Sequence, residues 1–137
     1  MIINVGSNDG IKENMPVISD QGLVGHIISV TENTAKLQTI IDTASTTSCV
    51  ITTSRDMMIA RGTLSEKGSL KATYIPTEAT VLEGDKIETS GLGGIYPKGI
   101  HIGTIKKVTN TKNITDRYAM IETAVDFSKL ETVLVIK

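Results

Sequence analysis

Cysteine is the scarcest of the side chains from which a chemical site could be built in this sequence. Cys49 is the only cysteine among 137 residues, so no disulfide can form within the chain and no zinc site of several thiolates can be assembled. Its apolar neighbours Val50 and Ile51 favour a small buried hydrophobe over a reactive thiol. Redox chemistry and thiolate metal chemistry are therefore not indicated.

Aromatic residues and an excess of charge of either sign are also lacking. The four aromatic residues are Tyr74, Tyr96, Tyr118 and Phe127. They are too few to stack the bases of a single-stranded nucleic acid, and the core must be aliphatic. The formal net charge is −1, so no overall field attracts phosphate backbones or holds the chain on an anionic bilayer. These features disfavour nucleic acid as a partner.

Long apolar runs are missing as well. No stretch approaches the length needed to cross a bilayer, and no signal peptide is recognisable. The chain starts abruptly in a β-like run at residues 2–5, from which we expect it to be a piece of a longer protein.

Residues that suit a pleated surface are abundant, because Ile, Val and Thr make up roughly a third of the chain. Short runs of them, separated by turn signals every 8 to 12 residues or so, predict an all-β sandwich or barrel. Single helical turns are expected only at 42–48 and 126–130. Ser65, Glu66, Lys67 and Gly68 form a hairpin signal. The expected strands are 2–5, 16–19, 23–30, 36–41, 49–52, 57–64, 70–75, 86–89, 100–108, 118–124 and 132–136.

The two halves of the sequence resemble each other. The aligned segments are 13–19 with 83–89, 24–27 with 102–105, 39–42 with 123–126, and 50–51 with 134–135. Such a repeat predicts two related β units, each of about six strands, enough to close a small barrel. We place the first barrel at residues 1–54 and the second at 55–137. Strands from 118–137 are candidates to complete the first barrel.

Six glycines and a proline gather between Gly84 and Ile105. Gly91, Gly93 and Gly94 predict a tight, structured turn between two strands, with Pro97 in the loop because it cannot donate to a sheet ladder. A phosphate-binding loop is disfavoured, because no helix follows the glycines.

This stretch resembles the signature of the MreC family of rod shape-determining proteins, approximately G-D-x-V-x-T-S-G-x-G-G-x-F/Y-P-x-G-I-x-V-G. A second block between residues 10 and 45 is similar to that family's G-I-x-x-x-M-x-V-x-x-x-x-G-L-V-G-x-V. The matching positions of the first block are Gly84, Asp85, Thr89, Ser90, Gly91, Gly93, Gly94, Tyr96, Pro97, Gly99, Ile100 and Gly103. In the second block, the G-L-V-G run is Gly22, Leu23, Val24 and Gly25.

The resemblance implies a non-enzymatic scaffold of the cell-wall elongation machinery that maintains rod shape. MreC-like proteins have one membrane-spanning helix, a coiled coil and two extracytoplasmic six-stranded barrels that resemble the chymotrypsin-like double barrel. The expected partners are class B penicillin-binding transpeptidases, MreD, the RodA glycosyltransferase and, indirectly, the MreB filament. Self-association is expected too. Neither a cofactor nor a metal is expected, and contact with the membrane would occur only through a helix that this sequence lacks.

A serine hydrolase is the alternative function. Ser90 could act as nucleophile, His26 as base, and Asp42 or Asp56 as orienting acid, in the chain order of chymotrypsin-like enzymes. The Gly-x-Ser-Gly spacing of such a nucleophile is absent, and His26 lies in the middle of an expected strand. A glycan-binding barrel is a third option, weakened by the scarcity of aromatics. For a scaffold, the rim of the 57–75 hairpin is a candidate partner surface.

Overall fold

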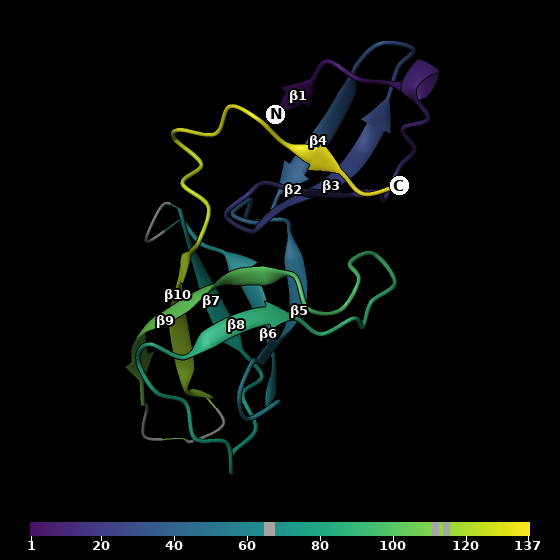
Figure 1. Ribbon diagram of the computed structural model, residues 1–137. Coiled ribbons are helices and arrows are strands. Elements are labelled where there is room, and N and C mark those ends of the chain that lie inside the picture. Colours follow the sequence, from purple (N-terminus) through teal and green to yellow (C-terminus); the bar gives the residue numbers. More distant parts are fainter. Residues whose placement is uncertain (65–67, 111–112, 114–115) are drawn as a thin grey trace.

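The computed structural model describes residues 1–64, 68–110, 113 and 116–137, and it confirms the all-β prediction (Figure 1). A single 3-10 turn, η1 (Ser7–Asp9), lies between the first two strands. The strands are β1 (Ile2–Ile3), β2 (Pro16–Ile18), β3 (Leu23–Val30), β4 (Ala35–Thr39), β5 (Thr46–Ile51), β6 (Met57–Gly62), β7 (Ser69–Thr73), β8 (Lys86–Thr89), β9 (His101–Thr109), β10 (Tyr118–Thr123) and β11 (Leu134–Val135).

The strands form two separate hydrogen-bonded systems. In Figure 1 a five-stranded sheet of order β1-β4-β3-β2-β11 lies above a closed barrel of order β10-β7-β6-β5-β8-β9. We call the first the open sheet and the second the barrel. The barrel has the six strands predicted for each unit, although β5 comes from the segment assigned to the first unit, and the other system is an open sheet of five strands. The difference arises because β6, which joins β7 to β5 and so closes the barrel, has no counterpart between β1 and β11 in the open sheet.

The predicted internal repeat is confirmed by strand register. Three strands of the open sheet, β2-β3-β4, pair in the same way as β8-β9-β10 of the barrel. Both β2 and β8 carry a register shift after the same aligned position. The facing positions that coincide are Val17 with Ile87, Gly25 with Gly103, and Thr39 with Thr123.

Two equivalent glycines explain why this frame can pack so closely. A β-carbon on Gly25 would lie 1.9 Å from the carbonyl oxygen of Gln38, and one on Gly103 would lie 2.1 Å from that of Glu122. Both distances are far inside van der Waals contact with backbone, so no side chain fits at either position without moving a strand.

The last strand of each repeat pairs with the first strand of the other. Ile51 of β5 faces Ile87 of β8, and Val135 of β11 faces Val17 of β2. The pairing therefore does not follow the predicted division at residue 54, because β5 is hydrogen-bonded into the barrel. Among the C-terminal strands only β11 joins the open sheet, while β10 stays in the barrel. The division into 1–54 and 55–137 as folding units stays a prediction.

The hydrophobic core also extends across the two strand systems. The barrel cluster contains Cys49, whose thiol pKa is raised to about 12 by burial, as expected for an inert hydrophobe. It also contains Leu23, the first residue of β3, and Ile40, which directly follows β4. Phe127 packs against both the barrel cluster and the smaller cluster of the open sheet. The two systems thus share buried surface.

Local structure departs from the sequence prediction in a few places. Strand β5 begins at Thr46, inside the segment 42–48 expected to be helical, because its first residues pair with β6. Both 42–48 and 126–130 hold one hydrogen-bonded turn: Ser45 N–H donates to the Asp42 carbonyl oxygen, and Lys129 N–H to that of Asp126. The expected hairpin strands are paired as β6 and β7, while residues 65–67 of their turn lie outside the described residues.

Candidate functional site at the glycine-rich loop

The glycine-rich loop, residues 90–100, connects β8 to β9 and is fastened at its base by Thr89. This side chain is fully buried, and its Oγ1 donates to the Pro97 carbonyl oxygen at 2.6 Å and accepts from Ile100 N–H at 2.8 Å. Gly99 N–H donates to the Thr89 carbonyl oxygen at 3.0 Å. A threonine hydroxyl is needed here because it must donate and accept at once in a dry position.

The path of the loop depends on left-handed backbone. Gly91 has a φ of 84°, and a β-carbon there would also lie 2.9 Å from that of Lys98. Ser90 Oγ bonds Ser48 Oγ of β5 at 2.8 Å and accepts from Leu92 N–H. The other signature glycines with positive φ are Gly84, Gly93, Gly94 and Gly99. The loop is therefore a structured turn whose first serine is tied to the neighbouring strand.

Asp85 shapes the entry to β8. Its Oδ2 accepts from Leu82 N–H at 2.9 Å, and its own N–H donates to the Leu82 carbonyl oxygen. The acid thus closes a tight turn, in which the adjacent Gly84 has a φ of 90°.

The two sequence blocks that carry the family resemblance meet in space. Tyr96 of the loop is buried, and its hydroxyl lies 2.9 Å from Nδ1 of His26 on β3, with the two rings edge to face. Burial raises the pKa of Tyr96 and lowers the pKa of His26. Gly22 lies against the His101 carbonyl oxygen, and Leu23 is buried in the barrel cluster. The loop thus connects the barrel to the open sheet through the contact between Tyr96 and His26.

The residues of the hydrolase alternative are not brought together by their hydrogen bonds. Ser90 bonds Ser48 and Leu92, and His26 bonds Tyr96. Asp42 Oδ1 accepts from the Ala44 N–H. Within the part of the chain that the structure describes, none of these bonds joins the serine, the histidine and an acid into a relay.

The described residues contain no group of three or more His, Cys, Asp or Glu side chains placed to hold a metal ion. In the same residues, no helix has both the length and the apolar character needed to span a membrane.

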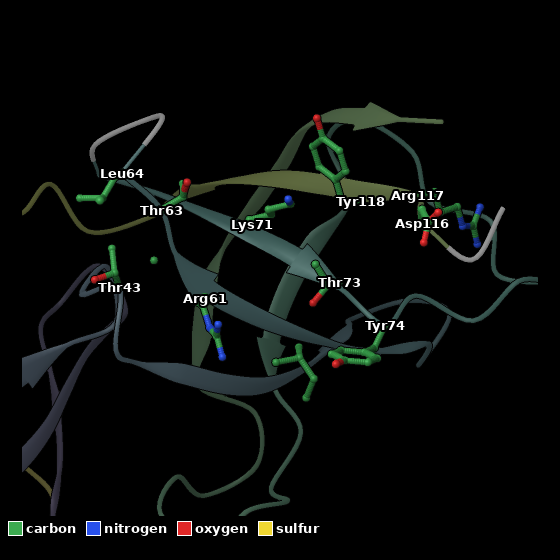
Figure 2. Close-up of a pocket in the computed structure, with 12 residues that line it drawn as sticks. Thr43, Arg61, Thr63, Leu64, Lys71, Thr73, Tyr74, Asp116, Arg117 and Tyr118 are labelled. Carbon is green, nitrogen blue, oxygen red and sulfur yellow. The ribbon is translucent and has the colours of Figure 1, made fainter. Parts of the chain in front are cut away.

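Sequence reasoning missed a groove on the outer face of β6, β7 and β10, which Figure 2 shows. Its volume is about 740 Å³. The side chains that dominate it are Arg61, Lys71, Tyr74, Arg117 and Tyr118. These side chains come to one face only through the strand register, which the sequence does not show. The sequence signal that could have indicated this surface is that Tyr74 and Tyr118 are two of the four aromatic residues in the chain.

Comparison with known proteins identifies relatives along the whole chain. The family model described as "Rod shape-determining protein MreC, barrel core" matches residues 1–137. The cell shape-determining protein MreC of Listeria monocytogenes is 33% identical over 138 residues, covering 98% of this chain and 47% of that protein. The chain therefore spans about half the length of this curated relative.

Solved structures share the fold. MreC from Pseudomonas aeruginosa superimposes with a TM-score of 0.93 at 26% identity, over 99% of this chain and 87% of that one. The MreC chain in a complex between penicillin-binding protein PBP2 and MreC from Helicobacter pylori gives a TM-score of 0.72 at 19% identity, over 91% and 79%. The predicted family resemblance is confirmed.

Proposed function

This chain belongs to the MreC family of rod shape-determining proteins, and we propose that it is a non-enzymatic scaffold in bacterial cell-wall elongation. The observation that carries the proposal is the match of the MreC barrel core over residues 1–137. In this proposal the domain lies outside the cytoplasmic membrane and organises peptidoglycan synthases. It also associates with further copies of itself.

A penicillin-binding transpeptidase is the first proposed partner. Support comes from the Helicobacter pylori relative, which is described as forming a complex with PBP2. MreD, RodA and, indirectly, MreB complete the proposed assembly. The signature loop has a structural role in this proposal: Thr89 and Ser90 fasten it to the barrel, and Tyr96 bonds His26 of the open sheet.

The test is direct binding between the 137-residue chain and the purified elongation transpeptidase, measured by pull-down and calorimetry. Charge-reversing substitutions on the barrel and on the open sheet, made in turn, should locate the contact as a loss of binding on one of them. Absence of binding at all transpeptidase concentrations would contradict the scaffold proposal.

Ser90→Ala separates the scaffold from the hydrolase alternative. We expect this variant to bind the transpeptidase as the unaltered chain does, because the serine hydroxyl is engaged in hydrogen bonds within the chain, to Ser48 and Leu92. We also expect no labelling of the unaltered chain by a serine-directed fluorophosphonate. Labelling that disappears in Ser90→Ala would establish the hydrolase instead.

A further inference from the structure

The β6–β7 groove lies on a hairpin that contains β6, a strand without an equivalent in the internal repeat. Strands β2 to β5 have counterparts in β8 to β11, and β1 lies beside β4 as β7 lies beside β10, whereas β6 has no counterpart in the open sheet. The groove faces outward on a closed barrel, so no free strand edge is available there and a ligand must be recognised by side chains.

Two like charges face each other on the groove floor. Arg61 of β6 and Lys71 of β7 are directly opposed partners across the two strands, and both are exposed. Facing like charges are unfavourable for sheet pairing. Within the described residues Arg61 makes no ion pair or side-chain hydrogen bond, and Lys71 Nζ lies 4.4 Å above the Tyr118 ring centroid. The pair is therefore a local concentration of positive charge in a chain whose net charge is −1.

The other charges of the groove leave this site positive. Arg117 is already engaged, because its Nη2 donates to the carbonyl oxygens of Pro76 and Ala79. Asp116 is the one acid among the described lining residues, and in Figure 2 it lies beside Arg117, on the side of the groove away from Leu64. Arg61 and Lys71 are thus the cations open to a ligand.

Apolar side chains flank the cations along the strand direction. Leu64 is 89% exposed beyond one end of the pair, and Tyr74 is 82% exposed beyond the other. Tyr74 also has a φ of 55°, an uncommon and strained conformation for a bulky residue. This conformation leaves the ring outside while the next residue, Ile75, enters the core. Leu64 is three residues beyond Arg61 on one strand, and Tyr74 is three residues beyond Lys71 on the antiparallel strand. The two apolar side chains are therefore separated by about 20 Å along the strands, the length of about six residues of an extended ligand.

We propose that the β6–β7 groove binds an extended acidic segment of a partner protein. Carboxylates of the segment pair with Arg61 and Lys71, which removes the repulsion between the two cations. Apolar side chains of the same segment pack on Leu64 and Tyr74. A protein segment fits better than an anionic polysaccharide, because the two ends of the groove offer apolar contacts that a polysaccharide without apolar groups would not use.

The test uses a capped hexapeptide with three central Asp and Glu residues between leucines. Its controls are the same peptide with Asn and Gln in place of the acids, and polygalacturonate. Binding to the 137-residue chain is followed by amide chemical shifts. We expect the acidic peptide alone to shift the signals of β6 and β7, and we expect its affinity to fall as salt rises.

Substitutions make the test specific. Arg61→Glu should weaken peptide binding at least about tenfold, yet leave the melting temperature equal or higher, because Glu faces Lys71 across the strands. Tyr74→Asn should weaken binding too and should not lower the melting temperature, since Asn tolerates positive φ. Lys86→Glu, on β8 across the barrel, is the matched control and should bind as the unaltered chain does.

Three results would overturn the proposal: equal binding of the amide peptide, equal loss in Lys86→Glu, or Arg61-dependent binding of polygalacturonate without binding of the acidic peptide. The last result would assign the groove to an anionic polymer. The inference deepens the proposed scaffold function, but the peptide measurement does not use the transpeptidase. Failure of transpeptidase binding with intact peptide binding would reject the scaffold and keep the groove, and the reverse outcome would do the opposite.

Discussion

The open sheet and the barrel contain the same three-stranded frame but complete it differently. In both, a glycine near the start of the middle strand lies against backbone of the next strand. The barrel adds β6 and closes, with seventeen buried residues in its cluster against seven in that of the open sheet. The shared frame sets strand pairing, and the element inserted between the repeats decides closure.

The largest effect is expected from replacing either of the two equivalent glycines with valine. Gly103→Val should lower the free energy of unfolding by about 3 to 5 kcal/mol, because its β-carbon would overlap the Glu122 carbonyl oxygen. Gly25→Val should cost a similar amount through Gln38. Urea unfolding measures both. The neighbouring Thr104→Val is the control, expected within about 0.5 kcal/mol of the unaltered chain. A small effect at only one glycine would mean that the two frames are not equivalent.

The connections from β2 to β3 and from β8 to β9 differ in length, and the longer one can be probed at its glycines. Gly91→Val should destabilise the chain by about 3 kcal/mol, because positive φ and the contact with Lys98 act together. At Gly94 a β-carbon meets nothing within 4 Å, so Gly94→Val should cost only the backbone strain, about 1 to 2 kcal/mol. Thermal unfolding should rank them in that order, and the reverse order would contradict the described loop packing.

Aligned hydroxyls at the ends of β2 and β8 allow a finer comparison. Thr89→Val leaves the Ile100 N–H and the Pro97 carbonyl oxygen without their partner, and should cost about 2 kcal/mol. Its counterpart Ser19 accepts one long hydrogen bond, from Gln21 N–H at 3.2 Å, so Ser19→Ala should cost about 1 kcal/mol or less. Equal losses in urea unfolding would show that Thr89 does not fasten the loop.

The smallest effect concerns the contact between the open sheet and the loop, and it depends on pH. Burial lowers the pKa of His26 below its ordinary 6.5, so the unfolded chain binds a proton more readily than the folded one. The resulting stability is complete above about pH 6.5 and is lost as the pH falls toward the lower folded value. His26→Gln should make the melting temperature less dependent on pH in this range, while His101→Gln should not change that dependence. Equal slopes in all three proteins would contradict this assignment.

Much of this architecture is readable from the sequence because it rests on local patterns. Runs of β-branched residues place the strands, and the aligned glycines Gly25 and Gly103 fix the repeat. The pairing of 132–136 with the first unit follows from the same alignment, which places residues 134–135 on 50–51. The open state of the first sheet does not follow, because closure depends on whether a strand such as β6 joins two distant edges of the sheet.

The candidate sites were less predictable, for a related reason. Ser90, His26 and Asp42 have a familiar chain order, but their partners are set by packing, and each bonds a different neighbour. Arg61 and Lys71 look like ordinary surface charges until register places them opposite each other. The 57–75 hairpin was identified as a candidate surface, whereas the particular side chains required the closed barrel to be seen.

The reciprocal exchange of β5 and β11 has a consequence for how the chain is made. Strand β2 lies near the start of the sequence and its partner β11 ends two residues before the last one. A polypeptide that emerges N-terminus first must therefore hold an unfinished sheet until β11 has been made, and such long-range pairing is slow. Without β11, strand β2 would keep β3 as a neighbour but would expose its other edge, so the open sheet is completed only by a segment far away in the sequence.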